Sequence, residues 1–408
     1  MSHAEPQMNA GLPKKHGVAC HATFEAYSQV MEDALRDHFC RVYSPDYRKS
    51  LRKFSAKEAT ELIGISGSHL RKLHSELMFD SGVTKVGGRR AYSLEQIHEI
   101  RDFMAKSPKS GHNYIPGRRH DDDHMQIISL LNLKGGSSKT TNTISLAQLF
   151  AAKGYRVLAV DLDPQASLTT YFGLQYELSL ERSGSIYDSV RYDDPISIRE
   201  VIRSSYFPGL DICPANLLLA EFEQETPRIL MEQNPSTVPF YQRVSRALSE
   251  VDDDYDIVFV DCPPSLGYLT LSAINASTSL IIPVIPSMID IASMSQFLSF
   301  ASDLYGVIKR YSGVDPIVDD FKFLPSRFEP YDSPSVQMLT FLRNHLGDAV
   351  MNSAMIKSTA FSDAAITNQT LFDIRRSDVH RQTYDRAMES LNAVNAEIEN
   401  MVQANWGR

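Results

Sequence analysis

The chain has 408 residues, of which 43% are hydrophobic and 22% are charged, values typical of a soluble globular protein with two or three domains. No apolar run reaches the ~18 residues of a transmembrane helix, and the first residues lack the apolar core of a signal peptide. The four cysteines lie far apart without a CxxC pair, which argues against a disulfide framework or a zinc site. These features exclude a membrane-spanning segment and favour a cytoplasmic protein.

The formal net charge of −9 conceals a basic segment. Residues 46–119 hold 15 Lys and Arg against 8 Asp and Glu, a balance of +7, so the remainder of the chain carries −16. A basic segment in an acidic protein is expected where the segment meets a polyanion such as DNA. A solvated surface that is merely basic remains the alternative.

The first predicted element is an amphipathic helix over residues 20–43, with Phe24, Val30 and Met31 among the residues of its apolar stripe. A lone helix cannot bury such a stripe, so it must pack on the next domain or on a second chain. We expect the second arrangement and assign residues 1–45 to a leader and a dimerisation helix.

Residues 46–107 predict a compact domain. Helices are expected over 56–63, 67–78 and 94–105, and residues 84–92 have the pattern of a β-hairpin around two glycines. Capping boxes precede the first and third helices, at Ser55 with Glu58 and at Ser93 with Gln96. Helix, turn, helix, hairpin and helix is the order of a winged helix-turn-helix.

This domain resembles the DNA-binding head of MerR-type regulators and of the larger plasmid partition ATPases. Helix-turn-helix units also serve as plain interaction modules, and that alternative stays open. The basic residues expected to contact DNA are His69, Arg71 and Lys72 on the second helix, and Lys85, Arg89 and Arg90 on the wing.

Residues 108–125 read as a linker, because they are rich in proline, glycine and charge and lack periodicity. Residues 126–408 predict one α/β domain, because apolar strands alternate with helices, and such strands imply a mostly parallel sheet with helices on both faces. The expected strands are 126–133, 156–160, 210–213, 256–260, 280–284 and 322–324, and the clearest helices are 140–153, 266–276 and 380–405.

The strongest chemical signal is the loop Lys134-Gly-Gly-Ser-Ser-Lys-Thr-Thr141, placed between a predicted strand and a predicted helix. It fails the ordinary phosphate-loop pattern GxxxxGK[ST], which needs glycine where Leu133 and Ser138 stand. It matches the deviant pattern KGGxxK[ST]T and so resembles the ParA/MinD class of ATPases. The small side chain of Ser138 should be tolerated there, although it departs from the usual glycine.

The residue types of this loop suit a bound nucleoside triphosphate. Gly135 and Gly136 let backbone N–H groups turn toward phosphate oxygens, and the N-terminus of the following helix adds its dipole. Lys139 is placed to neutralise the β- and γ-phosphates, and the Thr140 hydroxyl to ligate Mg²⁺. The resemblance implies that Lys134 reaches the nucleotide of a partner subunit. The expected nucleotide-binding residues are Lys134, Gly135, Gly136, Ser137, Ser138, Lys139, Thr140 and Thr141.

Two more segments place carboxylates at the ends of predicted strands. Asp161 and Asp163 share one face, because side chains alternate along a strand, and Asp261 ends a later strand before two prolines. The segments resemble the DxDPQ and DxxxxDxPP motifs of the same class. The resemblance implies that Asp163 orients the attacking water, and that Asp161 and Asp261 hold the hydration shell of Mg²⁺. The predicted catalytic residues are Lys134, Lys139 and Asp163, and the predicted metal site is Thr140, Asp161 and Asp261.

Together the motifs and the head resemble the large (type Ia) ParA partition ATPases, most of all the RepA proteins of repABC-type plasmids. The resemblance implies a homodimer that uses ATP and Mg²⁺, coats the nucleoid through non-specific DNA binding, works with a ParB-like centromere-binding partner and represses its own operon at an operator. The family's non-specific DNA contacts lie on C-terminal helices, where Arg343 and Lys357 are candidates.

Three rival classes share the ATPase core. A MinD-like membrane positioner would end in a basic amphipathic helix, but residues 388–408 lack a basic stripe. An iron–sulfur-linked reductase would need paired cluster cysteines, which the chain does not offer convincingly. A transcriptional repressor without a segregation role could have lost Lys134 or Asp163, and both are present.

Overall fold

The computed structural model describes two units of the chain, Met1–Arg48 and Lys49–Arg408. In the first unit one helix is described, α1 (Cys20–Val42), which covers the predicted amphipathic helix to within one residue. Its apolar residues Phe24, Tyr27, Val30 and Met31 are all exposed within the unit. The described residues of the whole chain are 20–42, 49–76, 84–86, 89–107, 111–120, 122–174, 184–232, 234, 237–313 and 315–408.

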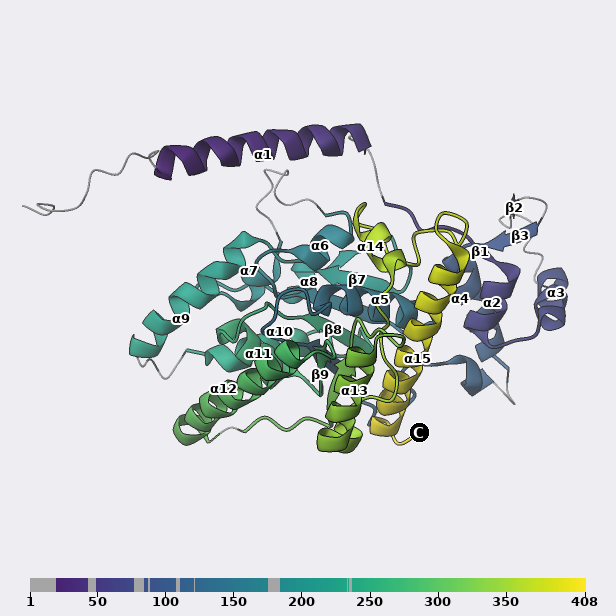
Figure 1. Cartoon of the computed structure of the whole chain (residues 1–408). Helices are drawn as coiled ribbons and strands as arrows, with labels where there is room; N and C mark the ends of the chain where they lie inside the picture. Colours follow the sequence, from purple (N-terminus) through teal and green to yellow (C-terminus); the bar gives the residue numbers. More distant parts are fainter. Residues whose placement is uncertain are drawn as a thin grey trace, which may run out of the picture. The chain divides into compact units, whose positions relative to one another are not determined.

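The second unit begins with the elements of the predicted head (Figure 1). A small antiparallel sheet has the strand order β1-β3-β2, and three helices accompany it. The order is that expected for a winged helix-turn-helix, and the DNA-binding role of the unit stays a prediction. The elements are β1 (Phe54–Ser55), α2 (Ala56–Ile63), α3 (Gly67–Glu76), β2 (Thr84–Val86), β3 (Arg89–Tyr92) and α4 (Leu94–Ala105). Residues 77 and 78, predicted as the end of the second helix, lie outside the described residues.

Both predicted capping boxes are confirmed. The Ser55 hydroxyl accepts from the Glu58 backbone N–H, and the Glu58 carboxylate accepts from the Ser55 N–H at 2.7 Å. Ser93 and Gln96 make the same reciprocal pair at the start of α4. These bonds satisfy N–H groups that the first helical turn leaves without partners, which explains why both helices begin at the predicted residues.

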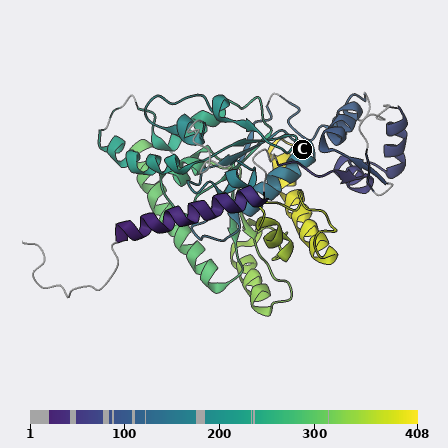
Figure 2. The same ribbon diagram turned by 90° about the horizontal axis from the view of Figure 1, so that it is seen from above.

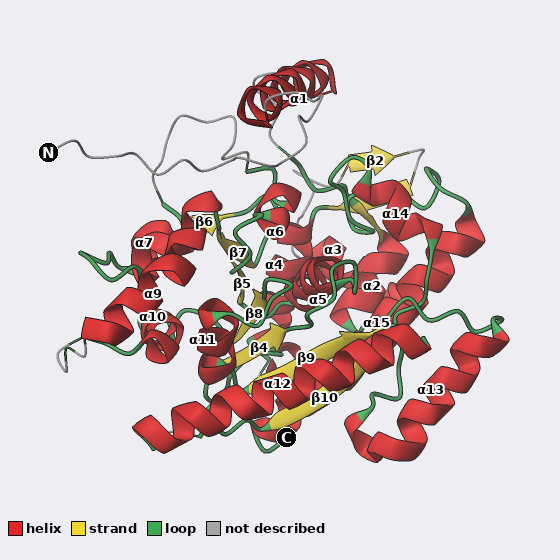
Figure 3. Ribbon diagram, turned by 60° about the vertical axis from the view of Figure 1, so that its left-hand side comes forward, coloured by secondary structure: helices red, strands yellow, loops and turns green. Residues whose placement is uncertain are grey.

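A seven-stranded sheet forms the centre of the second unit (Figure 3). Its strand order is β10-β9-β4-β8-β5-β7-β6, and every neighbouring pair is parallel except β6 with β7. The prediction of a mostly parallel sheet is therefore confirmed. The strands are β4 (Gln126–Leu130), β5 (Val157–Asp161), β6 (Arg203–Ser204), β7 (Leu210–Cys213), β8 (Ile257–Asp261), β9 (Ser279–Val284) and β10 (Asp320–Pro325).

Helices cover both faces of this sheet. Along β5, Val157 and Ala159 join the core on one face, while Leu158 and Val160 join the core on the other. The first face packs against α5 (Lys139–Ala152), α6 (Ser167–Tyr171), α14 (Thr359–Ala365) and α15 (Arg381–Asn405). The second packs against α7 (Ile186–Val190), α8 (Ile198–Val201), α9 (Ala220–Glu232), α10 (Arg243–Ser249), α11 (Tyr268–Ala276), α12 (Met288–Ser312) and α13 (Ser333–Leu346). Short 3₁₀ turns occupy Gly111–Tyr114, Leu217–Leu219, Phe240–Gln242 and Gly347–Ala349.

The head shares its hydrophobic core with α5 and α15, and Figure 2 shows it at one end of the unit. Phe54, Leu70 and Ile97 of the head belong to the same buried cluster as Phe150 of α5. A hydrogen bond of 2.9 Å also joins the His98 ring to the carbonyl of Ala151, near the end of α5. The head therefore packs directly on the helix that follows the predicted phosphate loop.

Among the described residues, no helix has the length and apolar character needed to cross a bilayer.

Candidate nucleotide-binding site

The three predicted motifs meet at the carboxyl edge of the large sheet. The phosphate loop follows β4, Asp161 ends β5 and Asp261 ends β8, and β8 lies between β4 and β5. Asp161 and Asp261 are register partners on adjacent strands. Open parallel sheets bind ligands at this edge, so the strand order alone brings the motifs together.

The phosphate loop has free space above its glycines. A Cβ atom added to Gly135 or Gly136 would meet no other atom of the protein within 4 Å, and Gly136 has a φ of +77° that favours glycine. The next residue, Ser137, is buried, and its hydroxyl has no hydrogen-bond partner. A buried polar group without a partner is costly, and a bound phosphate could supply the acceptor. The loop therefore fits an anionic ligand.

Ser138 has an unusual backbone conformation. Its φ of 69° lies in the left-handed region, where a residue with a Cβ pays about 1 kcal/mol or more. This residue is also the N-cap of α5, and its side chain makes no capping hydrogen bond. Ser138 therefore replaces the usual glycine at a position whose backbone conformation favours glycine. Backbone strain of this kind is common in functional loops.

The Lys139 side chain is buried and bonded to the backbone of the loop region. Its ammonium donates to the carbonyls of Asn132 at 3.0 Å and Lys134 at 3.5 Å, which are both neutral acceptors. Burial lowers the pKa of Lys139 from its ordinary value, and the nearby Asp261 carboxylate opposes that shift. A buried ammonium bonded to neutral groups gains strongly from an added anion. This geometry supports the predicted contact with phosphate.

Thr140 and Asp261, two predicted metal residues, are in direct contact. The Thr140 hydroxyl donates to Asp261 at 2.6 Å, and Thr143 approaches the other carboxylate oxygen at 3.5 Å. Burial, together with the charge of Asp161, raises the pKa of Asp261 well above its usual range. Two buried carboxylates on adjacent strands repel each other, so a divalent cation at this place would be favourable.

Asp161 organises the turn that follows β5. Its carboxylate accepts from the backbone N–H and the hydroxyl of Thr169, both at 2.8 Å, and from the Asp163 N–H at 3.1 Å. Burial raises the pKa of Asp161 to about 7, although these hydrogen bonds act in the opposite direction. Asp163 is only half-buried, and it accepts from the Gln165 N–H at 3.0 Å. Their predicted roles toward Mg²⁺ and water remain predictions.

Lys134 is paired within its own subunit. Its ammonium lies 2.7 Å from a carboxylate oxygen of Asp290, in the first turn of α12. The Lys134 backbone N–H donates to the side chain of Asn132 at 3.0 Å, and Asn132 donates to the Pro283 carbonyl at 2.7 Å. The sequence analysis missed Asn132 and Asp290, since neither belongs to a motif and Asp290 is distant in the chain.

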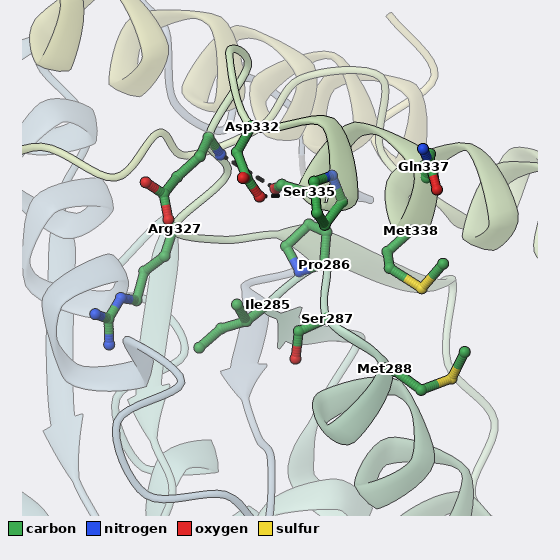
Figure 4. A pocket seen from close by; sticks show the side chains of 11 residues that line it. Ile285, Pro286, Ser287, Met288, Arg327, Asp332, Ser335, Gln337 and Met338 are labelled. Atoms are coloured by element: carbon green, nitrogen blue, oxygen red, sulfur yellow. Dashed lines mark hydrogen bonds between the residues drawn. The ribbon is translucent and has the colours of Figure 1, made fainter.

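A pocket of about 360 Å³ is lined by residues that follow β9 and β10. Figure 4 shows Arg327 on one side of this pocket and Met288 and Met338 on the other. Arg327 has a left-handed φ of 51°, and its guanidinium donates to the carbonyl of Gly136 at 3.4 Å. The pocket thus connects to the phosphate loop through Arg327, another residue that the sequence analysis did not single out.

The predicted DNA contacts lie in the head and in the C-terminal region. In the head, His69, Arg71, Lys72 and Arg90 are exposed, while the side chains of Lys85 and Arg89 lie outside the described residues. His74, also on α3, is buried and makes an edge contact with the Tyr92 ring. In the C-terminal region, Arg343 donates to the Asn352 carbonyl at 2.8 Å, and Lys357 pairs with Glu329 at 2.8 Å. Both side chains are exposed.

The sheet topology and the loop after β4 are those of a phosphate-loop nucleotide-binding protein. Residues 125–310 match the family model described as an AAA domain. A relative from Rhizobium rhizogenes, named as a replication protein A, is 44% identical over 388 residues, which are 95% of this chain and 96% of the relative. The chromosome partitioning protein ParA of Caulobacter vibrioides is 28% identical over 243 residues, or 59% of this chain and 84% of that protein.

The fold also matches a solved partition protein with a TM-score of 0.64 and 20% identity, covering 92% of this chain and 98% of that one. The chain belongs to the ParA family of partition ATPases. Its full-length match to replication protein A confirms the expected likeness to the large RepA-type members of that family.

Proposed function

We propose that the protein is a Mg²⁺-dependent ATP hydrolase that partitions a plasmid or similar replicon. The observation that supports this most is the phosphate loop, which combines a buried Lys139, an unpartnered Ser137 hydroxyl and open space at its two glycines. A solved relative in fold, the McdA protein of Cyanothece, was crystallised as an ATP complex, with a TM-score of 0.52 and 16% identity. That likeness supports the fold, and this chain's own residues support the ligand.

In this proposal the loop from Lys134 to Thr141 binds the triphosphate, with Lys139 on the β- and γ-phosphates. Thr140, Asp161 and Asp261 would hold Mg²⁺ and its waters. The bound ion would neutralise charge that develops on the phosphates during hydrolysis. The described residues contain no group of three His, Cys, Asp or Glu arranged for a metal, so the ion would depend on the phosphates for its remaining ligands. Asp163, beside the site and half-buried, would orient the attacking water.

The pocket beside Arg327 would take the base and ribose. Its lining combines apolar side chains such as Ile285 and Met338 with polar and charged ones such as Glu329. Such a mixed lining offers apolar contact to a purine ring and hydrogen-bond partners to its polar atoms and to the ribose. The nucleotide would then run from this pocket, past Gly136, to Lys139.

Two surfaces support pairing of two copies. One is α1, which exposes Phe24, Tyr27 and Met31 at helical spacing. The other is the carboxyl edge of the sheet, where Met288 and Ile289 are 62% and 76% exposed beside Lys134. Exposed apolar residues of this kind mark interaction surfaces. We therefore propose an ATP-dependent homodimer in which Lys134 reaches the nucleotide of the second copy.

The paired protein would bind non-specific DNA, associate with the nucleoid, and respond to a ParB-like partner that binds the centromere. The head would repress the protein's own operon by binding an operator through His69, Arg71, Lys72 and the wing residues Lys85, Arg89 and Arg90. Exposure of Arg71 and Arg90 supports the head's role, and the full-length likeness to replication protein A supports partition. The head shares its core with α5, so tests of it require the whole chain.

Binding of the full chain to random-sequence DNA tests this proposal. With ATP and Mg²⁺ we expect salt-sensitive binding, and with ADP much weaker binding. The double change Arg343→Ala and Lys357→Ala should weaken binding and lower the slope of log affinity against log salt by up to about two, since each lost phosphate contact removes roughly 0.9. Fluorescence anisotropy over a salt series measures both quantities.

The matched control is Arg228→Ala with Lys309→Ala. Both residues are exposed and ion-paired, like Lys357, and they lie on α9 and α12. This control should bind DNA as the unchanged protein does. Equal binding with ATP and ADP would contradict the ATP-dependent DNA step, and equal losses in both double variants would contradict the assignment of Arg343 and Lys357.

A further inference from the structure

Lys134, the residue proposed to act across the dimer, is held by a carboxylate of its own subunit. Its ammonium lies 2.7 Å from Asp290. The lysine side chain remains 37% exposed, whereas the Asp290 side chain is only 8% exposed. Solvent or a second molecule can therefore reach the Lys134 end of the ion pair, whereas the Asp290 end is covered by the protein.

Asp290 has a fixed position. It lies in the first turn of α12, where its backbone N–H donates to the hydroxyl of the N-cap residue Ser287, and that hydroxyl donates to the second carboxylate oxygen. The backbone of Lys134 is also fixed, through its hydrogen bond to Asn132. Because hydrogen bonds hold both anchor points, the flexible chain of the lysine is the part of the pair that moves most easily.

The ion pair borders the surface where a second copy would bind. Met288 and Ile289 precede Asp290 directly and are largely exposed, and the phosphate loop that carries Lys134 opens on the same edge of the sheet. The Asp290 carboxylate is mostly buried in its own subunit, whereas the Lys134 side chain is 37% exposed. An ammonium that turns outward to a phosphate of a second subunit therefore moves away from Asp290 and weakens the ion pair.

We propose that Asp290 is a positioning residue that keeps Lys134 in its own subunit and thereby opposes ATP-dependent pairing until the nucleotide of a second copy competes for the lysine. The inference rests on the proposed function of the site. It assigns a restraining role to a residue outside the three nucleotide motifs.

The burial of Asp290 explains why the ion pair should oppose the pairing of two copies. When Lys134 leaves, the Asp290 carboxylate stays mostly buried and loses its counter-charge, which is unfavourable. A symmetric dimer breaks two such pairs. Replacing Asp290 by asparagine removes the charge that must be left behind, while the amide oxygen can still accept from the Ser287 hydroxyl.

The test compares the unchanged full chain with Asp290→Asn. Sedimentation velocity with ATP and Mg²⁺ should show dimers at lower protein concentration, with a dissociation constant lower by roughly tenfold, the size expected for two partly exposed ion pairs. Without nucleotide, the Lys134 amine should react severalfold faster with an acetylating reagent, as measured by mass spectrometry. A merely structural role for Asp290 would not produce this faster reaction together with tighter pairing.

A matched control accompanies the test. Asp315→Asn removes the same charge from an exposed pair with Lys309, outside the nucleotide site, and should leave dimerisation and Lys134 labelling unchanged.

An unaltered dissociation constant, or weaker pairing, in Asp290→Asn would overturn the inference, and so would unaltered labelling. If the unchanged protein itself forms no dimers with ATP, the proposed homodimer fails instead. The two failures are therefore distinguishable in one series of measurements.

Discussion

Lys139→Ala should lower the affinity for ATP by about a hundredfold, since the variant loses the buried ammonium that we propose contacts two phosphates. In the structure this ammonium donates to the carbonyls of Asn132 and Lys134, which hold it close to the backbone of the loop. No bond of Lys139 to a carboxylate needs to break when phosphate arrives. Isothermal titration with a non-hydrolysable ATP analogue and Mg²⁺ measures the effect.

Lys153→Ala is the matched control, because Lys153 follows the last residue of the same helix and pairs with Glu399 on α15. It should bind nucleotide with normal affinity. A Lys139→Ala protein that is folded and still binds the analogue as tightly as the unchanged protein would show that the triphosphate lies elsewhere.

Asp163→Ala should retain ATP affinity and lose turnover, by at least a hundredfold, the scale of a positioned group that acts on the attacking water. The loop from Lys134 to Thr141 remains intact in this variant, so binding should persist. The turn after β5 should also persist, because its bonds from Asp163 N–H and Thr169 to Asp161 do not use the Asp163 side chain. Single-turnover hydrolysis and a binding titration, made on the same preparation, separate the two effects.

Asp163→Asn keeps an acceptor for the Gln165 N–H and so controls for the shape of the turn. We expect both variants to bind ATP normally. Normal turnover in Asp163→Ala would refute the assigned role. Loss of binding in Asp163→Ala but not in Asp163→Asn would mean that Asp163 serves the turn rather than the water.

The sequence predicted those parts of the site that are local in the chain. The spacing of Lys134, Gly135, Gly136 and Lys139 identified the phosphate loop, and the apolar runs identified the strands that carry Asp161 and Asp261. Because parallel strands place their carboxyl ends together, these local patterns were sufficient to predict one common edge. Capping boxes fixed the starts of α2 and α4 for the same reason, since both partners lie within four residues.

Contacts between distant segments could not be predicted in this way. Asp290 meets Lys134 only because α12 follows β9, a neighbour of β4, and Arg327 reaches Gly136 only because β10 is the next strand. The left-handed backbone at Ser138 likewise follows from the shape of the loop, since serine itself gives no signal for it. The burial of His74 was equally hard to predict, because a polar residue on α3 would be expected at the surface, and it lies in the core of the head.

Local sequence patterns also could not predict that the head and the nucleotide domain share one hydrophobic core. Composition separates residues 46–107 from residues 126–408, and the linker between them has no regular pattern. The packing of Ile97 and His98 of α4 against α5 depends on surfaces that only the folded chain brings together. The predicted domain boundaries remain predictions, and both regions lie in the single unit Lys49–Arg408.

The central claim is that ATP turnover at this loop drives partition, and steady-state ATP hydrolysis by the full chain tests it most directly. Turnover is measured with the protein alone, with random-sequence DNA, and with DNA plus the ParB-like partner. The account predicts slow Mg²⁺-dependent turnover alone, a severalfold or greater increase with DNA and partner together, and none of this in Asp163→Ala. Absence of hydrolysis under all three conditions, or turnover unaffected by DNA and partner, would contradict it.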